Sequence, residues 1–327
     1  MPWKGEKNPY KIWLSEIILQ QTQVAQGIGY YNRFIEKYPT IFDLAAAEDR
    51  EVFKLWEGLG YYNRCKNLLF TARYLVNMKN GQFPSTFNEL MTLKGIGAYT
   101  ASAISSFAFN LPNAVLDGNV FRVLSRFFGI YTAIDTNEGK KIFASLANNL
   151  LDKKNAGVYN QSIMDFGATV CKSLPLCTEC LINTRCEAFL KNLVDTLPAK
   201  EKKVIRTHRW IYFLIIEYEG RVYTRKRTAN DIWQNLYEFI KIDPPTKLPL
   251  KQLRSGQFFE SILNGHKYFI NKISAVQQQL LTHQVVKGRF ITISIKTPLL
   301  LEGYELVTKR ELRELPFPKF ITTYLKE

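Results

Sequence analysis

The stretch LKGIGAYTA at Leu93–Ala101 predicts a short turn that opens directly into a helix. Two glycines, Gly95 and Gly97, stand two apart, and glycine allows positive φ or a close approach of the backbone to another molecule. The run behind them would present the unpaired N–H groups of its first turn to an anion. The stretch therefore predicts a hairpin that grips a phosphate, although Gly-x-Gly turns are also common as plain structural turns.

An acidic residue follows the hairpin after a loop, where Asp117-Gly118-Asn119-Val120 begins a second helix-like run. An Asp in front of a helix is commonly an N-cap, which is a structural role. Beside a phosphate-binding hairpin, Asp117 also indicates chemistry on the backbone or sugar of a nucleic acid. These few residues leave both roles open.

The composition points to a large basic protein with an anionic partner. The chain has 327 residues, 46% of them hydrophobic, which is enough for two domains, and its formal net charge is +15. Aromatic residues make up 13% and are interleaved with Lys and Arg, which favours nucleic acid, although a ribosomal or membrane-surface protein would share this charge. We see no signal peptide and no membrane-spanning run, so we expect an intracellular, cytoplasmic monomer.

Four of the five cysteines, spaced C-x5-C-x2-C-x5-C, lie in one short segment. Disulfides are disfavoured inside cells, so the four thiols predict a metal or cluster site. Zinc sites favour two close pairs, and only one is present here, which favours an iron–sulfur cluster over zinc. The expected ligands are Cys171, Cys177, Cys180 and Cys186, whereas Cys65 stands alone and suits a small core position.

The chain divides into a mostly helical part and a later α+β part. Apolar residues recur every three or four positions from 10 to 190, which predicts helices. Residues 210–218, 221–224 and 291–296 are strand candidates, with a helical piece near 258–263, so we expect a mixed or antiparallel sheet. We place the domains at residues 1–196 and 208–327, joined by a basic linker at 197–207.

Glu16 lies on the first predicted helix, off its main apolar stripe and between Ile12 and Leu19. If that face is covered, burial would raise the pKa of Glu16, as a general acid requires. The residues alone slightly favour a solvated surface Glu. The polar run Gln20–Gln23 behind it is either an exposed helix end or a set of amides aimed at bases.

Together these motifs resemble the adenine DNA glycosylases of the MutY family, in the helix-hairpin-helix glycosylase superfamily. The resemblance extends over nearly the whole chain and depends on several long motifs in the right order. They are Pro2-Trp3, Pro9–Glu16, Leu19–Val24, Trp56–Arg64, the hairpin, Asp117–Val120 and Asn160–Cys171. It implies a helical glycosylase domain with a 4Fe-4S cluster loop, followed by a smaller Nudix-like α+β domain.

The resemblance also implies a substrate, double-stranded DNA with adenine opposite 8-oxoguanine or guanine, and a role for each site residue. Adenine is flipped out of the duplex, protonated by Glu16 and released, while Asp117, positioned by Asn119, stabilises the oxocarbenium-like sugar. Gln161 would lie along the adenine edge, and Gly95 and Gly97 would hold DNA. Family residues that wedge into the stack or contact the orphaned base correspond to Gln21, Thr22, Leu59 and Tyr61.

Tyr99 stands where the related endonuclease-III-like enzymes have a lysine that attacks the sugar as an amine. The resemblance therefore implies a monofunctional glycosylase. In the second domain, Ile232–Phe239 matches the family's strand signature, but nothing after it fits the glutamate-rich helix with which Nudix hydrolases bind magnesium. Thr282 and His283 fall where the family has a loop that senses 8-oxoguanine.

Two alternatives stay open. One is an endonuclease-III-like glycosylase and lyase that acts on oxidised pyrimidines, against which Tyr99 and the long second domain argue. The other is a catalytically silent iron–sulfur protein that binds damaged DNA, against which the presence of both Glu16 and Asp117 argues. Adenine removal in base excision repair is the function that the sequence favours.

Overall fold

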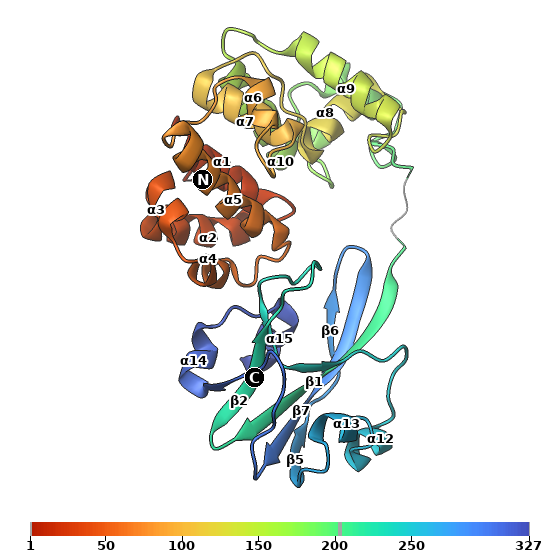
Figure 1. Cartoon of the computed structure of the whole chain (residues 1–327). Helices are drawn as coiled ribbons and strands as arrows, with labels where there is room; N and C mark the ends of the chain where they lie inside the picture. Colours follow the sequence, from red (N-terminus) through yellow and green to blue (C-terminus); the bar gives the residue numbers. More distant parts are fainter. Residues whose placement is uncertain (1, 202–204, 327) are drawn as a thin grey trace. The chain divides into compact units, whose positions relative to one another are not determined.

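The computed structural model describes residues 2–201 and 205–326, which belong to two compact units (Figure 1). The helical unit comprises Met1–Ala46 and Lys66–Lys203, and the sheet unit comprises Ala47–Cys65 and Val204–Glu327. Residues 47–65 thus group with the C-terminal part of the chain, although they precede most of the helices. The boundaries expected at residues 196 and 208 stay a prediction.

The helical unit consists of helices joined by short turns, as the periodicity between residues 10 and 190 predicts. The helix-hairpin-helix is formed by α6, the turn at residues 92–97, and α7. The helices are α1 (Pro9–Leu19), α2 (Val24–Lys37), α3 (Ile41–Ala46), most of α5 (Asn63–Lys79), α6 (Phe87–Met91), α7 (Ala98–Phe109), α8 (Gly118–Phe128), α9 (Asn137–Leu150), α10 (Ala156–Thr169) and α11 (Glu187–Leu190).

Helix α1 is buried on nearly all sides. Asn8 caps its start by accepting a hydrogen bond from the Tyr10 amide at 2.9 Å, and Pro9 occupies the first turn, where no amide hydrogen is needed. The helix packs against α2 and α7, and its buried positions run without a break from Ile12 to Ile18. The face of α1 that carries Glu16 is therefore covered as well as the apolar stripe.

Two glycines let α10 approach its neighbours closely. A Cβ added at Gly157 would lie 2.7 Å from the Ser106 carbonyl oxygen of α7. One added at Gly167 would lie 2.7 Å from the Cβ of Asn119 on α8. Side chains at either position would push α10 away, so the absence of a Cβ sets how closely α10 packs against α7 and α8.

The sheet unit contains a mixed sheet, to which its described residues contribute eight strands. Five of them follow the order β3-β2-β1-β7-β5, and the other three pair with strands of this series. The central pair, β1 and β7, is parallel, and the other pairings are antiparallel; β4 also pairs with β1, β6 with β7 and β8 with β2. The strands are β1 (Thr207–Tyr218), β2 (Arg221–Lys226), β3 (Tyr237–Glu238), β4 (Ile240–Ile242), β5 (Tyr268–Ile273), β6 (Gln277–Leu280), β7 (Gln284–Ile295) and β8 (Glu305–Thr308).

The expected strands are thus confirmed, except that most of the stretch Ile232–Phe239 is not a strand. The predicted alternation is present in β7, where Ile291, Ile293 and Ile295 are buried and the residues between them are half-buried. In the stretch Ile232–Phe239, by contrast, only Tyr237–Glu238 forms a strand, and the residues before it form turns.

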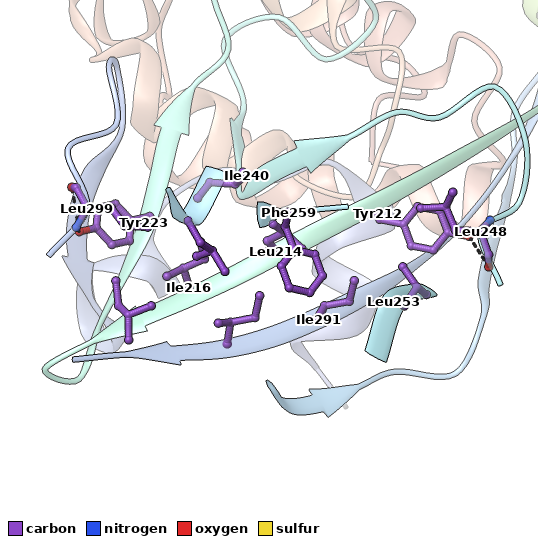
Figure 2. Packing of buried hydrophobic residues seen from close by; sticks show 13 residues of the cluster. Tyr212, Leu214, Ile216, Tyr223, Ile240, Leu248, Leu253, Phe259, Ile291 and Leu299 are labelled. Atoms are coloured by element: carbon purple, nitrogen blue, oxygen red, sulfur yellow. Dashed lines mark hydrogen bonds between the residues drawn. The ribbon is translucent and has the colours of Figure 1, made fainter. Parts of the chain in front are cut away.

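One face of the sheet carries an apolar core, drawn in Figure 2. Leu214 and Ile216 of β1 pack there with Ile291 of β7, together with Leu253 of α12 (Leu250–Ser255) and Leu263 of α13 (Glu260–Leu263). Burial of such a cluster is the main stabilising contribution to the fold. The remaining helices of this unit are α4 (Asp49–Trp56), α14 (Lys309–Glu314) and α15 (Lys319–Leu325).

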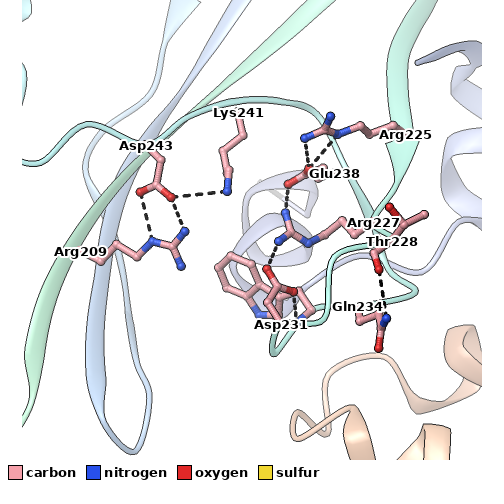
Figure 3. Close-up of polar contacts among 10 residues, drawn as sticks. Arg209, Arg225, Arg227, Thr228, Asp231, Gln234, Glu238, Lys241 and Asp243 are labelled. Carbon is pink, nitrogen blue, oxygen red and sulfur yellow. Dashed lines mark hydrogen bonds and ion pairs between the residues drawn. The ribbon is translucent and has the colours of Figure 1, made fainter. Parts of the chain in front are cut away.

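A buried ionic network holds the loop between β2 and β3 (Figure 3). Glu238 is only 2% exposed and accepts hydrogen bonds from both Arg225 and Arg227. Arg227 also pairs with Asp231 inside the loop. Loss of one partner would leave a buried charge uncompensated, so the network fixes the loop conformation.

We expect Gly288→Ala to destabilise the sheet unit. Gly288 of β7 lies opposite Ile211 of β1, and an added Cβ would come within 1.8 Å of the Ile211 carbonyl oxygen. Separating the two central strands should cost about 3 kcal/mol of unfolding free energy, measured by urea denaturation. The control is Gly29→Ala in α2, where the added Cβ meets only the Arg33 guanidinium at 3.6 Å. Equal stability of the two variants would contradict the prediction.

Candidate active site

A cavity of about 380 Å³ in the helical unit brings together residues from several segments of the chain. Ligand sites in proteins commonly have this size. Its walls come from the turns before and after α1, from α1 itself, from the start of α2, and from α7, α8 and α10. Six of the residues expected from the sequence line it: Glu16, Thr22, Tyr99, Asp117, Asn119 and Gln161.

Glu16 is buried in the wall of this cavity, with 5% of its surface exposed. A solvated surface Glu, which the sequence allowed, is therefore wrong. Burial raises the pKa of Glu16 to about 7, and the nearby Asp117 carboxylate adds to the rise, while a hydrogen bond with Tyr99 opposes it. The Oε2 atom has no hydrogen-bond partner among the residues that the structure describes. This atom is buried as well as unpaired, so its hydrogen-bonding capacity beside the cavity is unsatisfied.

Asp117 is both a helix cap and a wall of the cavity. Its Oδ1 accepts a hydrogen bond from the Val120 amide at 2.7 Å and so caps α8. This is the N-cap role that the sequence left open for Asp117. Its Oδ2 accepts a hydrogen bond from the Asn119 side-chain amide, also at 2.7 Å. Burial raises the pKa of Asp117, whereas these hydrogen bonds act in the opposite direction. The carboxylate is thus desolvated but held in one orientation.

The two glycines of the hairpin differ: Gly95 has a positive φ, whereas Gly97 is extended, with φ −101°. Gly95 has φ +81°, and a Cβ there would lie 2.7 Å from the Asn67 side chain, so only glycine fits without strain. Gly97 is exposed and caps α7 without a side-chain bond, which leaves the first N–H groups of the helix open. Tyr99, two residues on, is turned inward toward Glu16, and burial raises its pKa well above the ordinary value.

Arg122 is a site residue that our sequence analysis missed. Its guanidinium donates to the Asn119 side-chain oxygen at 2.8 Å, to the Gly167 carbonyl at 2.6 Å and to the Cys171 carbonyl at 2.7 Å. It therefore fixes Asn119, which in turn holds Asp117. The signal was the helical spacing, since residues three apart on α8 share a face.

The four clustered cysteines gather around one apolar cavity beside α8 and α11. Arg126 reaches into this segment from α8, donating to the Lys172 carbonyl at 2.8 Å and lying 3.7 Å from the Cys171 sulfur. Burial raises the pKa of Cys177, and the other three thiols, Cys171, Cys180 and Cys186, act in the same direction, so the sulfurs are electrostatic neighbours. In the described residues, no three His, Cys, Asp or Glu side chains are arranged around a single metal ion.

The residues expected to contact the opposite base divide between the units. Thr22 lines the cavity, and Gln21 is exposed in the turn after α1 with φ +54°. Leu59, Tyr61, Thr282 and His283 all belong to the sheet unit. There, the Tyr61 hydroxyl forms a short hydrogen bond with the Thr282 hydroxyl, at the turn between β6 and β7.

Comparison with known sequences agrees with this geometry. Residues 14–149 match the model of the HhH-GPD superfamily of base excision DNA repair proteins, and residues 211–327 match the NUDIX domain. Adenine DNA glycosylase of Buchnera aphidicola subsp. Baizongia pistaciae is 39% identical over 243 residues, which are 73% of this chain and 68% of that protein. The chain belongs to the adenine DNA glycosylase family.

Other members of the adenine DNA glycosylase family and two solved structures support this placement. The human adenine DNA glycosylase is 41% identical over 198 residues, which are 58% of this chain and 36% of that protein. A thermostable thymine-DNA glycosylase superposes with a TM-score of 0.54 at 30% identity, covering 58% of this chain and 88% of the other. Endonuclease III in a non-covalent DNA complex gives 0.51 at 26%, covering 57% and 87%.

No helix among residues 2–201 and 205–326 combines the length and the apolar character that a membrane span requires.

The raised pKa of Glu16 gives a prediction for stability against pH. The fold tolerates the protonated form of Glu16 better than the ionised form. The contribution of Glu16 to the free energy of unfolding is therefore complete below pH 4.5 and is lost as the pH rises through about 7. Relative to Glu16→Gln, the unmodified protein should lose up to about 3 kcal/mol of unfolding free energy between these pH values. Urea denaturation of both proteins at several pH values measures the difference. Parallel pH profiles would show that Glu16 is not desolvated in the fold.

Proposed function

We propose that this protein is a monofunctional glycosylase that removes adenine opposite 8-oxoguanine in double-stranded DNA. The observation that carries the proposal is the pair of desolvated carboxylates, Glu16 and Asp117, in one cavity. A glycosidic bond inside a base stack is out of reach, so the adenine has to leave the duplex and enter this cavity. Two carboxyl groups with different environments then divide the work of bond cleavage.

Glu16 is suited to act as the general acid. With a pKa of about 7, a large share of Glu16 carries its proton at neutral pH. The unpaired Oε2 is the atom from which that proton would pass to a ring nitrogen of adenine, making the base a better leaving group. Proton donation by a positioned side chain commonly contributes a factor of about 10²–10⁴ in rate.

Asp117 is suited to the opposite role. It accepts hydrogen bonds from the Val120 amide and the Asn119 side chain, which favour the ionised carboxylate. An anion at this point would stabilise the positive charge that develops on the sugar when adenine leaves, or bond to it transiently before water attacks. Because Arg122 holds Asn119, the carboxylate needs no reorganisation during the reaction.

Gln161 supplies a reason for choosing adenine. Its Nε2 donates to the Asp165 carboxylate at 3.0 Å, and Lys4 pairs with the same carboxylate at 2.6 Å. A carboxylate only accepts, so this bond engages one of the two N–H groups of Gln161 and fixes which end of the amide is the oxygen, an acceptor. Adenine offers the N6 amino group as a donor, whereas guanine presents the O6 acceptor on the corresponding edge.

The residue at position 99 sets the reaction class. Strand cleavage by a glycosylase of the endonuclease III type needs an amine that attacks the sugar. Tyr99 offers a phenol whose pKa is raised by burial, so it supplies no such nucleophile near neutral pH. Base release should therefore leave the DNA strand intact.

The sheet unit would recognise the lesion rather than hydrolyse nucleotides. Helix α12, which follows β4, contains Lys251, Gln252 and Arg254 but no carboxylate that could hold magnesium. Thr282 and His283 at the turn between β6 and β7 would contact 8-oxoguanine together with Tyr61, which is 46% exposed, whereas Leu59 is buried and the expectation that it wedges into the stack is not supported. The hairpin amides after Gly97 and the net charge of +15 would hold the phosphate backbone.

The cysteine segment fits a 4Fe-4S cluster better than a zinc ion. Four thiols line one cavity, and their spacing contains only one close pair, whereas zinc sites favour two. Cys171, Cys177, Cys180 and Cys186 would hold the cluster, and Arg126 would donate toward the Cys171 sulfur. When bound, the cluster would cross-link the four cysteines and so stabilise the conformation of this segment.

The proposed activity is tested with a duplex that contains adenine opposite 8-oxoguanine. Strand breaks should appear only after alkali treatment, because the base is released without lyase chemistry. Asp117→Asn keeps the helix cap but loses the charge, and should lower the single-turnover rate at least ~10³-fold while duplex binding persists. The control is Asp195→Asn, an exposed carboxylate outside the cavity. Breaks without alkali would indicate a lyase, and normal excision by Asp117→Asn would refute the assignment.

We expect Cys180→Ser to lower the iron content and the visible absorbance of the purified protein, since one of four cluster ligands is lost. Cys65→Ala removes a buried cysteine of α5 outside the segment and should leave both signals unchanged. Metal analysis and absorbance spectra measure the effect. A colourless, zinc-loaded parent protein would overturn the proposal.

A further inference from the structure

The loop at residues 57–62, which we call the opposite-base loop, has an unusual backbone. Gly58 and Gly60 have φ +96° and +75°, and Tyr61 has φ +49°. A left-handed conformation is accessible to glycine but is strained for a residue with a side chain, such as Tyr61. Such a conformation persists only where its surroundings determine it, so the contacts that hold this loop are informative.

Some of these contacts come from residues that flank the loop in the sequence. The Trp56 indole donates to the Gly60 carbonyl at 3.1 Å, and the Arg64 guanidinium donates to the same carbonyl at 3.3 Å. Arg64 also lies over the rings of Trp56 and Tyr61, at 5.1 and 5.5 Å from their centroids. These contacts fix the far end of the loop but not its beginning at Glu57.

The beginning of the loop is held by residues that are distant in sequence but belong to the same sheet unit. Glu57 accepts the Phe317 amide at 2.8 Å, and Lys54 donates to the Leu315 carbonyl at 3.0 Å and to Glu57 at 3.1 Å. The Tyr62 hydroxyl donates to the Phe317 carbonyl at 3.3 Å. Since Leu315 and Phe317 are buried, the short segment 315–317 is a fixed anchor.

The exposed end of the loop meets the turn between β6 and β7. Tyr61 is 46% exposed, and its hydroxyl bonds to that of Thr282. The two groups proposed to contact the opposite base are therefore already paired with one another, and their alignment depends on where the loop is anchored. Glu57 is central to this anchoring, because its carboxylate accepts the Phe317 amide and also pairs with Lys54, which itself donates to the Leu315 carbonyl.

We propose that Glu57 is a positioning residue for recognition of the base opposite adenine. Its carboxylate ties the opposite-base loop to segment 315–317 and so keeps the Tyr61 side chain in register with Thr282. This inference rests on the proposed function. Without the carboxylate, Tyr61 relaxes from its left-handed backbone, and the protein loses discrimination between 8-oxoguanine and guanine opposite adenine while it retains excision chemistry, whose residues lie in the helical unit.

The test compares single-turnover adenine release from duplexes with 8-oxoguanine or guanine opposite adenine. Glu57→Ala should lower the ratio of the two rates about tenfold, the equivalent of one lost charge-assisted hydrogen bond. Glu57→Gln keeps an acceptor for the Phe317 amide and should leave the ratio unchanged. Tyr62→Phe removes one hydroxyl and should lower the ratio by about threefold. The control is Glu48→Ala, an exposed carboxylate at the start of α4 without a side-chain cap bond.

Thermal unfolding of each variant separates positioning from folding, because the rate ratio is compared at a temperature well below every melting midpoint, where all the variants are folded. If Glu57→Ala does not fold, Tyr62→Phe alone decides the outcome. An unchanged ratio in the folded variants overturns this inference and leaves the proposed function intact. A parent protein that releases no adenine from either duplex overturns the proposed function, and the inference with it.

Discussion

The helical unit depends on keeping water away from Glu16. Helix α1 is buried almost all round, so the carboxyl group cannot turn toward solvent, and its pKa rises to about 7. Asp117, in the same cavity, is desolvated too, but it receives hydrogen bonds from Val120 and Asn119. Glu16 keeps its Oε2 without a partner among the described residues, whereas both oxygens of Asp117 accept hydrogen bonds. This difference supports the proposed division into a proton donor and an anion.

This separation is built from ordinary helix physics. Asp117 is an N-cap at the positive end of the α8 dipole, a place that favours negative charge. The same helix carries Arg122 and Arg126, which reach the Cys171 carbonyl and the Lys172 carbonyl. A single helix thus contributes the cap, the brace for Asn119 and the contacts to the cysteine segment. The close approach of Gly167 to Asn119 completes the packing around the carboxylate.

Much of this could be predicted from the sequence, because local rules govern it. The hairpin glycines, the cap at Asp117, the strands at β1 and β7 and the clustered cysteines all follow from short-range spacing. The burial of Glu16 could not, since helical periodicity gives a face but not what covers it. The contact between Glu57 and Phe317 joins positions 260 residues apart, so no local sequence pattern predicts it. Turns replaced most of the expected strand before Tyr237 because they belong to a loop held by ionic pairs.

The grouping of residues 47–65 with the C-terminal unit has a consequence for how the protein can be divided. The backbone passes between the units three times, near residues 46, 65 and 203, so the units are interleaved along the gene. A chain that stopped before β1 would leave Glu57, Lys54 and Tyr62 without their partners at 315–317. The C-terminal part is therefore not a detachable module, and exchange of that part between relatives would have to preserve a matching stretch inside the helical sequence.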